Sequence, residues 1–151
     1  MRVGTSRFAS RQRDRPADSV DTLDFFMATF KRFEDILAWQ KARKLTQMAY
    51  EATAGTQFSK DFGLRSQIQR ACVSMMADIA EGAARRSDKD FASFVNIARA
   101  SAAEAQSHLY VALDLNYIDQ ITFDKLYAGL EEISRMLIGL AKHLHTKAQS
   151  L

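Results

Sequence analysis

The sequence predicts an all-α fold, an antiparallel bundle of four helices that run up, down, up and down. Hydrophobic residues make up 47% of the 151 residues, which is typical of a globular domain. One proline and six glycines in the whole chain favour long helices with few turns. Apolar residues recur at helical spacing in four successive segments, and no segment shows the alternation that is typical of a strand.

Residues 1–30 differ in composition from the rest of the chain. Serine, glycine and the only proline lie there among five arginines, Arg2, Arg7, Arg11, Arg13 and Arg15. The segment lacks the apolar region of a secretory signal, and its four aspartates are unlike a transit peptide. We expect a mobile basic tail over 1–30 and one four-helix bundle domain over 31–151. A translation start at Met27 is the alternative.

The first helix is expected at about 31–54. Gly55 follows it and is suited to a left-handed C-terminal cap. The predicted apolar face is made largely of alanine, at Ala38, Ala42, Leu45, Ala49 and Ala52. Small side chains on this face would allow a bulkier neighbouring helix to approach closely.

The second helix is expected at about 60–84, with Ser59 as its N-cap and Asp61 near the positive end of the helix dipole. Its apolar seam consists of Leu64, Ile68, Cys72, Met75 and Ile79. Because Cys72 is the only cysteine and lies on this seam, we expect a buried structural thiol and no disulfide within the chain.

A second line of side chains, the polar stripe, follows the same helix. Its members are Arg70, Ser74, Asp78, Glu81 and Arg85. Their spacing of three or four residues places them on one face. A solvated helix face needs no such order, so we expect the polar stripe to meet another helix or another subunit.

The third helix is expected at about 88–115 after the N-cap Ser87, and the fourth at about 123–147 after Thr122. The third seam comprises Phe91, Phe94, Ala98, Ala102, Ala105, Leu109 and Ala112. The fourth comprises Leu126, Leu130, Ile133, Leu137, Leu140 and Leu144, and Gly129 and Gly139 are expected to be close-packing points. Short connections favour antiparallel packing of consecutive helices.

Apolar residues also lie outside these seams. The clearest candidates for an oligomer interface are Trp39, Tyr50, Val73 and Met76. Further apolar residues outside the seams are Ala80, Tyr127, Met136 and Ile138. A single subunit exposing all of them would present an unusually large apolar patch. We therefore expect a homo-oligomer.

The sequence shows no convergent catalytic or metal-binding groups, so we expect a non-enzymatic protein without cofactor or metal; an enzyme is the least favoured alternative. No glutamate lies three residues before any of the histidines His108, His143 and His145, as a di-iron bundle would need. Gly82 stands outside any glycine-rich phosphate loop. Apolar runs such as 136–141 are too short to cross a membrane, and the lack of disulfides and of an export signal favours the cytoplasm.

Charge is unevenly placed along a chain of net charge +3. Residues 1–86 hold 15 Lys and Arg against 10 Asp and Glu, whereas residues 87–151 hold 6 against 8. This asymmetry favours an acidic partner such as nucleic acid, and an ordinary solvated surface is the alternative. The candidate phosphate-binding residues are Lys41, Arg43, Lys44, Arg85 and Arg86.

About residues 33–145 resemble the four-helix bundle family of 23S rRNA intervening-sequence proteins. The resemblance rests on Trp39-Gln40 with Ala42, on Gln67, Arg70 and Ser74, on Ile79-Ala80-Glu81-Gly82, and on Ser101 with Glu104. It implies a small bacterial bundle that forms a ring-shaped homopentamer. The family is also similar to the accessory variability protein of diversity-generating retroelements, a basic pentamer that binds nucleic acid and a reverse transcriptase.

The chain departs from the family pattern at three places. Phe58-Ser59 stands where a proline is usual, Asp78 where asparagine is usual, and Ala100 where glycine is usual. Asp78 adds a negative charge that Arg70 or Arg85 could balance. The leading hypothesis is an RNA-binding accessory protein. The alternative is a protein-interaction scaffold that recruits an enzyme such as a reverse transcriptase, with no direct nucleic-acid role.

Overall fold

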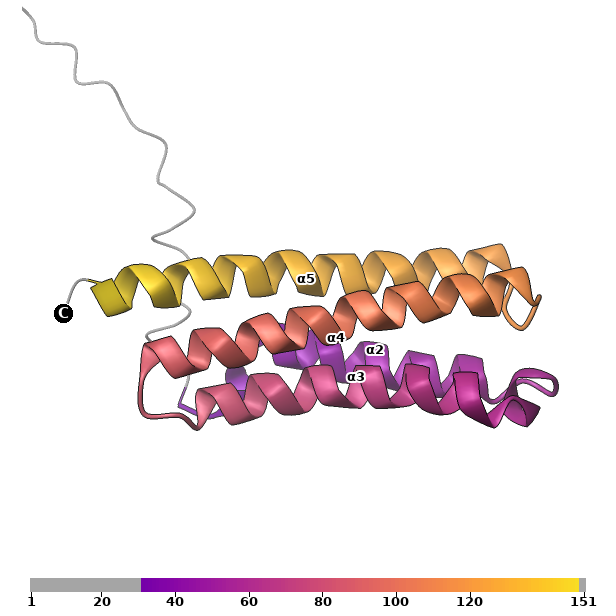
Figure 1. The fold of residues 1–151 in the computed structure, drawn as a ribbon, viewed down its shortest axis with the longest axis horizontal. Helices are drawn as coiled ribbons and strands as arrows, with labels where there is room; N and C mark the ends of the chain where they lie inside the picture. The colour runs from indigo at the N-terminus through magenta and orange to yellow at the C-terminus, as the bar shows by residue number, and fades with distance from the viewer. Residues whose placement is uncertain (1–30, 150–151) are drawn as a thin grey trace, which may run out of the picture.

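The computed structural model describes residues 31–149, so the tail expected over 1–30 lies outside the described residues. The described part is all-α, with four helices packed against one another and no strand (Figure 1). This confirms the prediction of an all-α fold with four packed helices. The helices are α2 (Leu37–Thr53), α3 (Phe62–Ala83), α4 (Asp88–Asp114) and α5 (Gln120–Gln149), with 3-10 turns η1 (Phe33–Asp35) and η2 (Phe58–Lys60).

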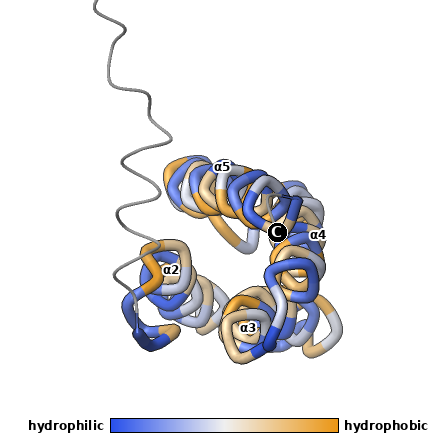
Figure 2. Tube along the Cα trace, turned by 90° about the vertical axis from the view of Figure 1, so that its left-hand side faces the viewer, coloured by the Kyte–Doolittle hydropathy of each residue, from blue (hydrophilic) through white to orange (hydrophobic). Residues whose placement is uncertain are grey.

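The four helices lie around a common centre when viewed along their length (Figure 2). Helix α3 packs along α4, α4 packs along α5, and α2 contacts both α3 and α5. Between α2 and α3, Thr46 Oγ1 donates to the Cys72 carbonyl at 3.3 Å and Gln69 Nε2 donates to Thr53 Oγ1 at 2.9 Å. The last turns of α5 lie beside the first turn of α4, where Lys147 Nζ is 3.8 Å from Asp88 Oδ2.

The core follows the four predicted seams closely. Most seam residues are buried, and the alanines of α2 and α4 face larger side chains of α3 and α5. Ala52, Leu64 and Phe94 are only half-buried, because they lie at the edges of their seams. Connecting segments add three buried residues that the seams did not include, Ile36, Phe58 and Ile118.

The first helix begins at Leu37, not near residue 31 as predicted. Residues 33–35 form the 3-10 turn η1, and the Asp35 carboxylate accepts the backbone N–H groups of Lys31 and Arg32 at 3.1 and 3.2 Å. The prediction of a left-handed cap at Gly55 is also wrong. No described glycine has a positive φ, and Ala54 ends α2 in a right-handed conformation with φ −82°.

Two other helix starts differ from the predictions. The N-cap of α3 is Asp61, whose Oδ1 accepts the Leu64 N–H at 3.1 Å, while Ser59 lies in the preceding 3-10 turn. Helix α5 begins at Gln120, because Asp119 Oδ1 accepts the Thr122 N–H at 2.8 Å. Hydrogen bonds from the side chain of Thr122, and then from its backbone, lower the pKa of Asp119. Ser87 caps α4 as predicted, accepting the Asp90 N–H at 3.1 Å.

Two glycines allow neighbouring helices to approach closely. A Cβ on Gly82 would lie 2.7 Å from Phe91 Cδ2 and 2.8 Å from Phe94 Cβ, and one on Gly129 would lie 2.5 Å from Leu45 Cδ1. Gly129 is therefore a close-packing point, as predicted. The same prediction is wrong for Gly139, where an added Cβ would meet nothing within 4 Å.

Candidate nucleic-acid interface

The five candidate phosphate-binding residues differ in their surroundings. Lys41 is half-buried, and its Nζ lies 2.7 Å from Glu132 Oε1 of α5. This contact lowers the pKa of Glu132 and satisfies much of the lysine's charge within the subunit. The other four side chains are exposed and form no ion pair with any residue of 31–149, so their charges remain available: Arg43, Lys44, Arg85 and Arg86.

Two of these arginines lie over aromatic rings. The Arg85 guanidinium carbon is 4.6 Å from the ring centre of Phe94 on α4. The Arg43 guanidinium carbon is 5.8 Å from the Trp39 ring, and Phe33 meets that tryptophan edge-on at 5.0 Å. Such contacts orient a guanidinium and leave its second face open to a ligand.

The helix arrangement separates charge along the bundle. We define the basic end as residues 31–45, 73–101 and 135–149, the halves of the helices on the side of the α3–α4 connection (Figure 1). It holds 12 Lys and Arg against 6 Asp and Glu. The acidic end, residues 46–72 and 102–134, holds 4 Lys and Arg against 8 Asp and Glu. All five candidate residues belong to the basic end.

Sequence reasoning missed several exposed cations that the fold adds to the basic end. The clearest are Arg32, Lys89 and Lys142, which lie on three different segments. The split at residue 86 concealed Lys89 and Lys142, because it followed chain order and counted them with the acidic half; Arg32 lies in the basic half and forms an ion pair with Glu34. A count by position along the helices would have supplied the signal, since the start of α2, the end of α3, the start of α4 and the end of α5 lie at the same end of the molecule (Figure 1).

Apart from Arg85, which lies over Phe94 of α4, the polar stripe is not buried against another helix within the described chain. Arg70, Ser74 and Glu81 are exposed, and Asp78 is half-buried. Partial burial, with a smaller effect of the Glu81 charge, raises the pKa of Asp78. Arg85 lies over Phe94, so it does not neutralise this carboxylate by a direct ion pair. Contact with another subunit stays a prediction for these residues.

The candidate interface residues lie on two helices that pack together, Trp39 and Tyr50 on α2 and Val73 and Met76 on α3. Tyr50 and Val73 are 45% and 44% exposed, whereas Trp39 and Met76 are half-buried against the core. The predicted apolar surplus is therefore only partly exposed, whereas other large apolar side chains, such as Ile97, Tyr110 and Ile121, are exposed as well. The role of the candidate residues in assembly stays a prediction.

No described residues form a group of three or more His, Cys, Asp or Glu that could hold a metal ion. His108 pairs with Glu104 one turn earlier on α4, with Nε2 and Oε1 3.3 Å apart. Cys72 is 1% exposed, and burial raises the pKa of its thiol to about 12, as expected for a structural cysteine.

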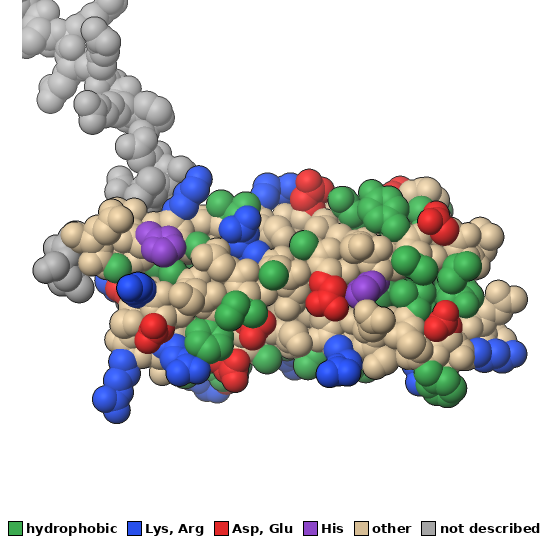
Figure 3. Space-filling model, in the orientation of Figure 1, with side chains coloured by type: hydrophobic (Ala, Val, Ile, Leu, Met, Phe, Trp, Pro, Cys, Tyr) green, Lys and Arg blue, Asp and Glu red, His purple; other side chains and the backbone are tan. Residues whose placement is uncertain are grey.

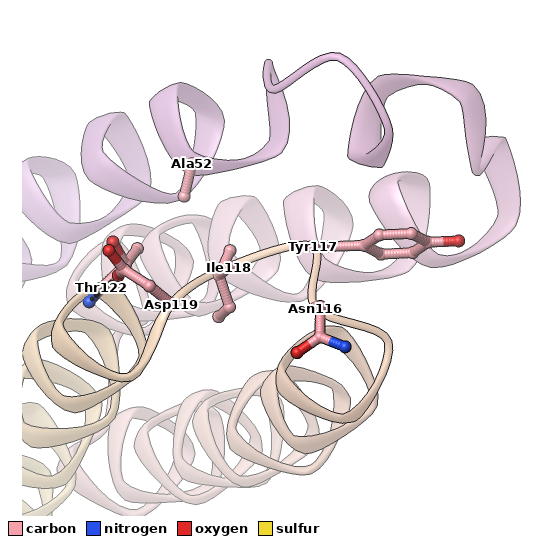
Figure 4. Close-up of a pocket in the computed structure, with 6 residues that line it drawn as sticks. All are labelled: Ala52, Asn116, Tyr117, Ile118, Asp119 and Thr122. Carbon is pink, nitrogen blue, oxygen red and sulfur yellow. Dashed lines mark hydrogen bonds between the residues drawn. The ribbon is translucent and has the colours of Figure 1, made fainter.

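An open pocket of about 390 Å³ lies at the α4–α5 connection (Figure 4). Asp119 contributes a carboxylate to its lining, but that group already accepts a backbone N–H at the start of α5. The Tyr117 ring points away from the other lining residues, and its hydroxyl donates to Asp61 Oδ2 at 3.1 Å. These polar groups already form hydrogen bonds at the start of α5 and with the N-cap of α3, so we assign the pocket no chemical function.

The structure thus defines a small all-α protein with an uneven distribution of charge, and no helix within 31–149 is long and apolar enough to cross a membrane. The chain belongs to the 23S rRNA-intervening sequence protein family, which it matches over residues 34–139. This match confirms the resemblance seen in the sequence.

One solved structure supports the same assignment. It is a protein of unknown function from the S23 ribosomal protein family of Bacteroides thetaiotaomicron. Its sequence is 26% identical to this chain, and the two structures superpose with a TM-score of 0.65. The aligned region covers 70% of this chain and 99% of the Bacteroides chain. No match was found among curated proteins.

Proposed function

We propose that this protein is a non-enzymatic, cytoplasmic RNA-binding accessory protein that works as a ring-shaped homopentamer. Within each subunit the four helices alternate in direction, a topology supported by the short connections and by the contact of Lys147 with Asp88. The family to which the chain belongs carries 23S rRNA in its name, which favours RNA as the nucleic acid.

The separation of charge along the bundle is the observation that carries this proposal. The basic end has an excess of cations, and four of the five candidate residues there are exposed without an ion pair among residues 31–149. Cations of this kind bind phosphates by releasing counterions. In a ring of identical subunits the same surface repeats, so that modest contacts add up to useful avidity.

Salt-dependent binding to structured RNA tests the proposal. We expect binding at low salt that weakens steeply as salt rises. Replacing Lys44, Arg85 and Arg86 together by glutamine should lower the slope of log affinity against log salt by up to about three. The matched control replaces the acidic-end residues Lys60, Arg65 and Lys125 by glutamine, which changes net charge equally. Absence of binding at low salt, or equal losses for both triple variants, contradicts the proposal.

The alternative, a scaffold that recruits an enzyme such as a reverse transcriptase, is favoured by a surface at the acidic end. Tyr110 and Val111 of α4 and Leu115, which follows its last residue, are 44–50% exposed, and the Tyr110 ring lies 5.8 Å from that of Tyr127 on α5. Figure 3 shows hydrophobic side chains gathered over this end of α4 and α5, with acidic side chains around them. Exposed apolar patches with a polar rim are typical of protein interfaces.

Binding of a purified reverse transcriptase distinguishes the two functions. A scaffold should keep its enzyme partner after replacement of Lys44, Arg85 and Arg86, and should lose it when Tyr110 and Leu115 are both changed to serine. A nucleic-acid binder should show the opposite pattern for RNA.

A further inference from the structure

We propose that the basic end recognises single-stranded RNA, because an unpaired base can stack on the Arg85 guanidinium where it lies over Phe94. This inference rests on the proposed RNA-binding function and names the form of RNA that the site takes. We call Arg85, Phe94 and the adjoining Arg86 the stacking corner. It lies at the connection between α3 and α4.

The geometry of the stacking corner suits a base. Arg85 is exposed, and its guanidinium carbon is 4.6 Å from the centre of the Phe94 ring. Phe94 is half-buried, and its Cβ lies so near Gly82 that a Cβ added to that glycine would be 2.8 Å away, so the base of the Phe94 side chain lies at the close contact between α3 and α4. One face of the guanidinium lies over the Phe94 ring, and the exposure of Arg85 leaves its other face accessible. Arginine planes of this kind stack on unpaired bases.

The charges around the stacking corner disfavour a duplex. Glu81 lies one turn before Arg85, and Asp88 and Asp90 occupy the first turn of α4. These carboxylates alternate with the cations and restrict the number of phosphates that can approach. A duplex has a higher density of phosphates and conceals the faces of its bases. A single strand can combine a phosphate contact to Arg86 with stacking on Arg85.

The chain offers a matched control pair at the other end of the bundle. The Arg65 guanidinium carbon lies 4.7 Å from the ring centre of Phe62, which is 69% exposed. This pair has almost the same cation–ring distance, but it lies at the acidic end, where carboxylates outnumber cations. If cation–aromatic stacking alone were sufficient, both pairs would bind RNA equally.

The test compares Arg85→Lys with Arg65→Lys in the full-length protein. Both variants keep the positive charge and lose the planar group, so phosphate attraction is preserved. The probes are a ten-nucleotide single-stranded RNA that carries one 2-aminopurine and the same RNA annealed to its complement. Affinity is measured by fluorescence anisotropy, and stacking by the quenching of 2-aminopurine.

We expect Arg85→Lys to weaken single-strand binding by about 5- to 100-fold and to abolish the quenching, since stacking of one base contributes at this level. Duplex binding should stay unchanged, as should single-strand binding by Arg65→Lys. Wild-type affinity of Arg85→Lys for the single strand, or an equal loss on the duplex, would overturn this inference while leaving RNA binding intact. Failure of the wild-type protein to bind either probe at low salt would overturn the proposed function as well.

Discussion

Single residues in this protein owe their chemistry to the helices around them. Lys41, Arg43 and Lys44 are close in sequence, yet only Lys41 reaches Glu132 of α5 and forms an ion pair. Asp61 caps α3 and also accepts a hydrogen bond from the Tyr117 hydroxyl. This hydrogen bond joins the α2–α3 connection to the α4–α5 connection. Cys72 is enclosed by the core, and its carbonyl accepts a hydrogen bond from the Thr46 hydroxyl. The residue types alone did not predict which of these side chains would be paired, which would cap a helix and which would be buried.

The Cys72 thiol makes stability depend on alkaline pH. Its pKa rises from an ordinary value of 9.0 to about 12 in the folded protein, so the folded state keeps the proton that the unfolded state loses. The stabilisation is fully present below pH 9 and is lost as pH rises from about 9 towards 12. The free energy of unfolding in urea should fall more steeply over this range for wild type than for Cys72→Ala, by up to about 1.4 kcal/mol per pH unit. Equal slopes would contradict the prediction.

At the scale of the elements, close contact between α3 and α4 depends on Gly82. A Cβ at this position would be 2.7 Å from Cδ2 of the Phe91 ring and 2.8 Å from Phe94 Cβ, so Gly82→Ala forces the Phe91 ring and the α4 backbone at Phe94 to move. We expect this variant to lose about 1–3 kcal/mol of stability in urea denaturation. Gly139→Ala, where a Cβ meets nothing within 4 Å, is the control and should gain up to about 1 kcal/mol. A Gly82→Ala variant as stable as wild type would disprove the close contact.

The sequence predicted the existence of the helices better than their ends. Periodic apolar residues identified the core because burial follows helical spacing, and Ser87 was recognisable as a cap. Ser59 and Asp61 were both suitable caps for α3. In the structure the Ser59 hydroxyl donates to the Thr56 carbonyl, whereas Asp61 caps the helix and also accepts a hydrogen bond from Tyr117. For the candidate site, the sequence supplied the cations but not their contacts. The ion pair of Lys41 with Glu132 joins α2 to α5, and the contact of Arg85 with Phe94 crosses the α3–α4 connection, so spacing within one helix carries no information about either.

At the scale of the whole molecule, assembly is the property to test first. The pentamer predicts a native mass near five times the 17.0 kDa chain in light scattering. Val73→Glu introduces a charge at a 44% exposed position on α3 and should dissociate the assembly. The control is Ile97→Glu on α4, a position that is 51% exposed and outside the candidate interface. A wild-type protein that stays a 17.0 kDa monomer at high concentration would refute the predicted oligomer.

The separation of charge between the two ends has a consequence for encounters in solution. Helix α4 has 27 residues and is about 40 Å long, whereas the Debye length is about 8 Å at physiological ionic strength. A polyanion that touches one end of the bundle is then shielded from the charges of the opposite end. The basic end and the acidic end therefore act as two independent electrostatic fields. At 0.01 M salt the Debye length grows to about 30 Å, and the molecule acts as a dipole that rotates an approaching polyanion before contact.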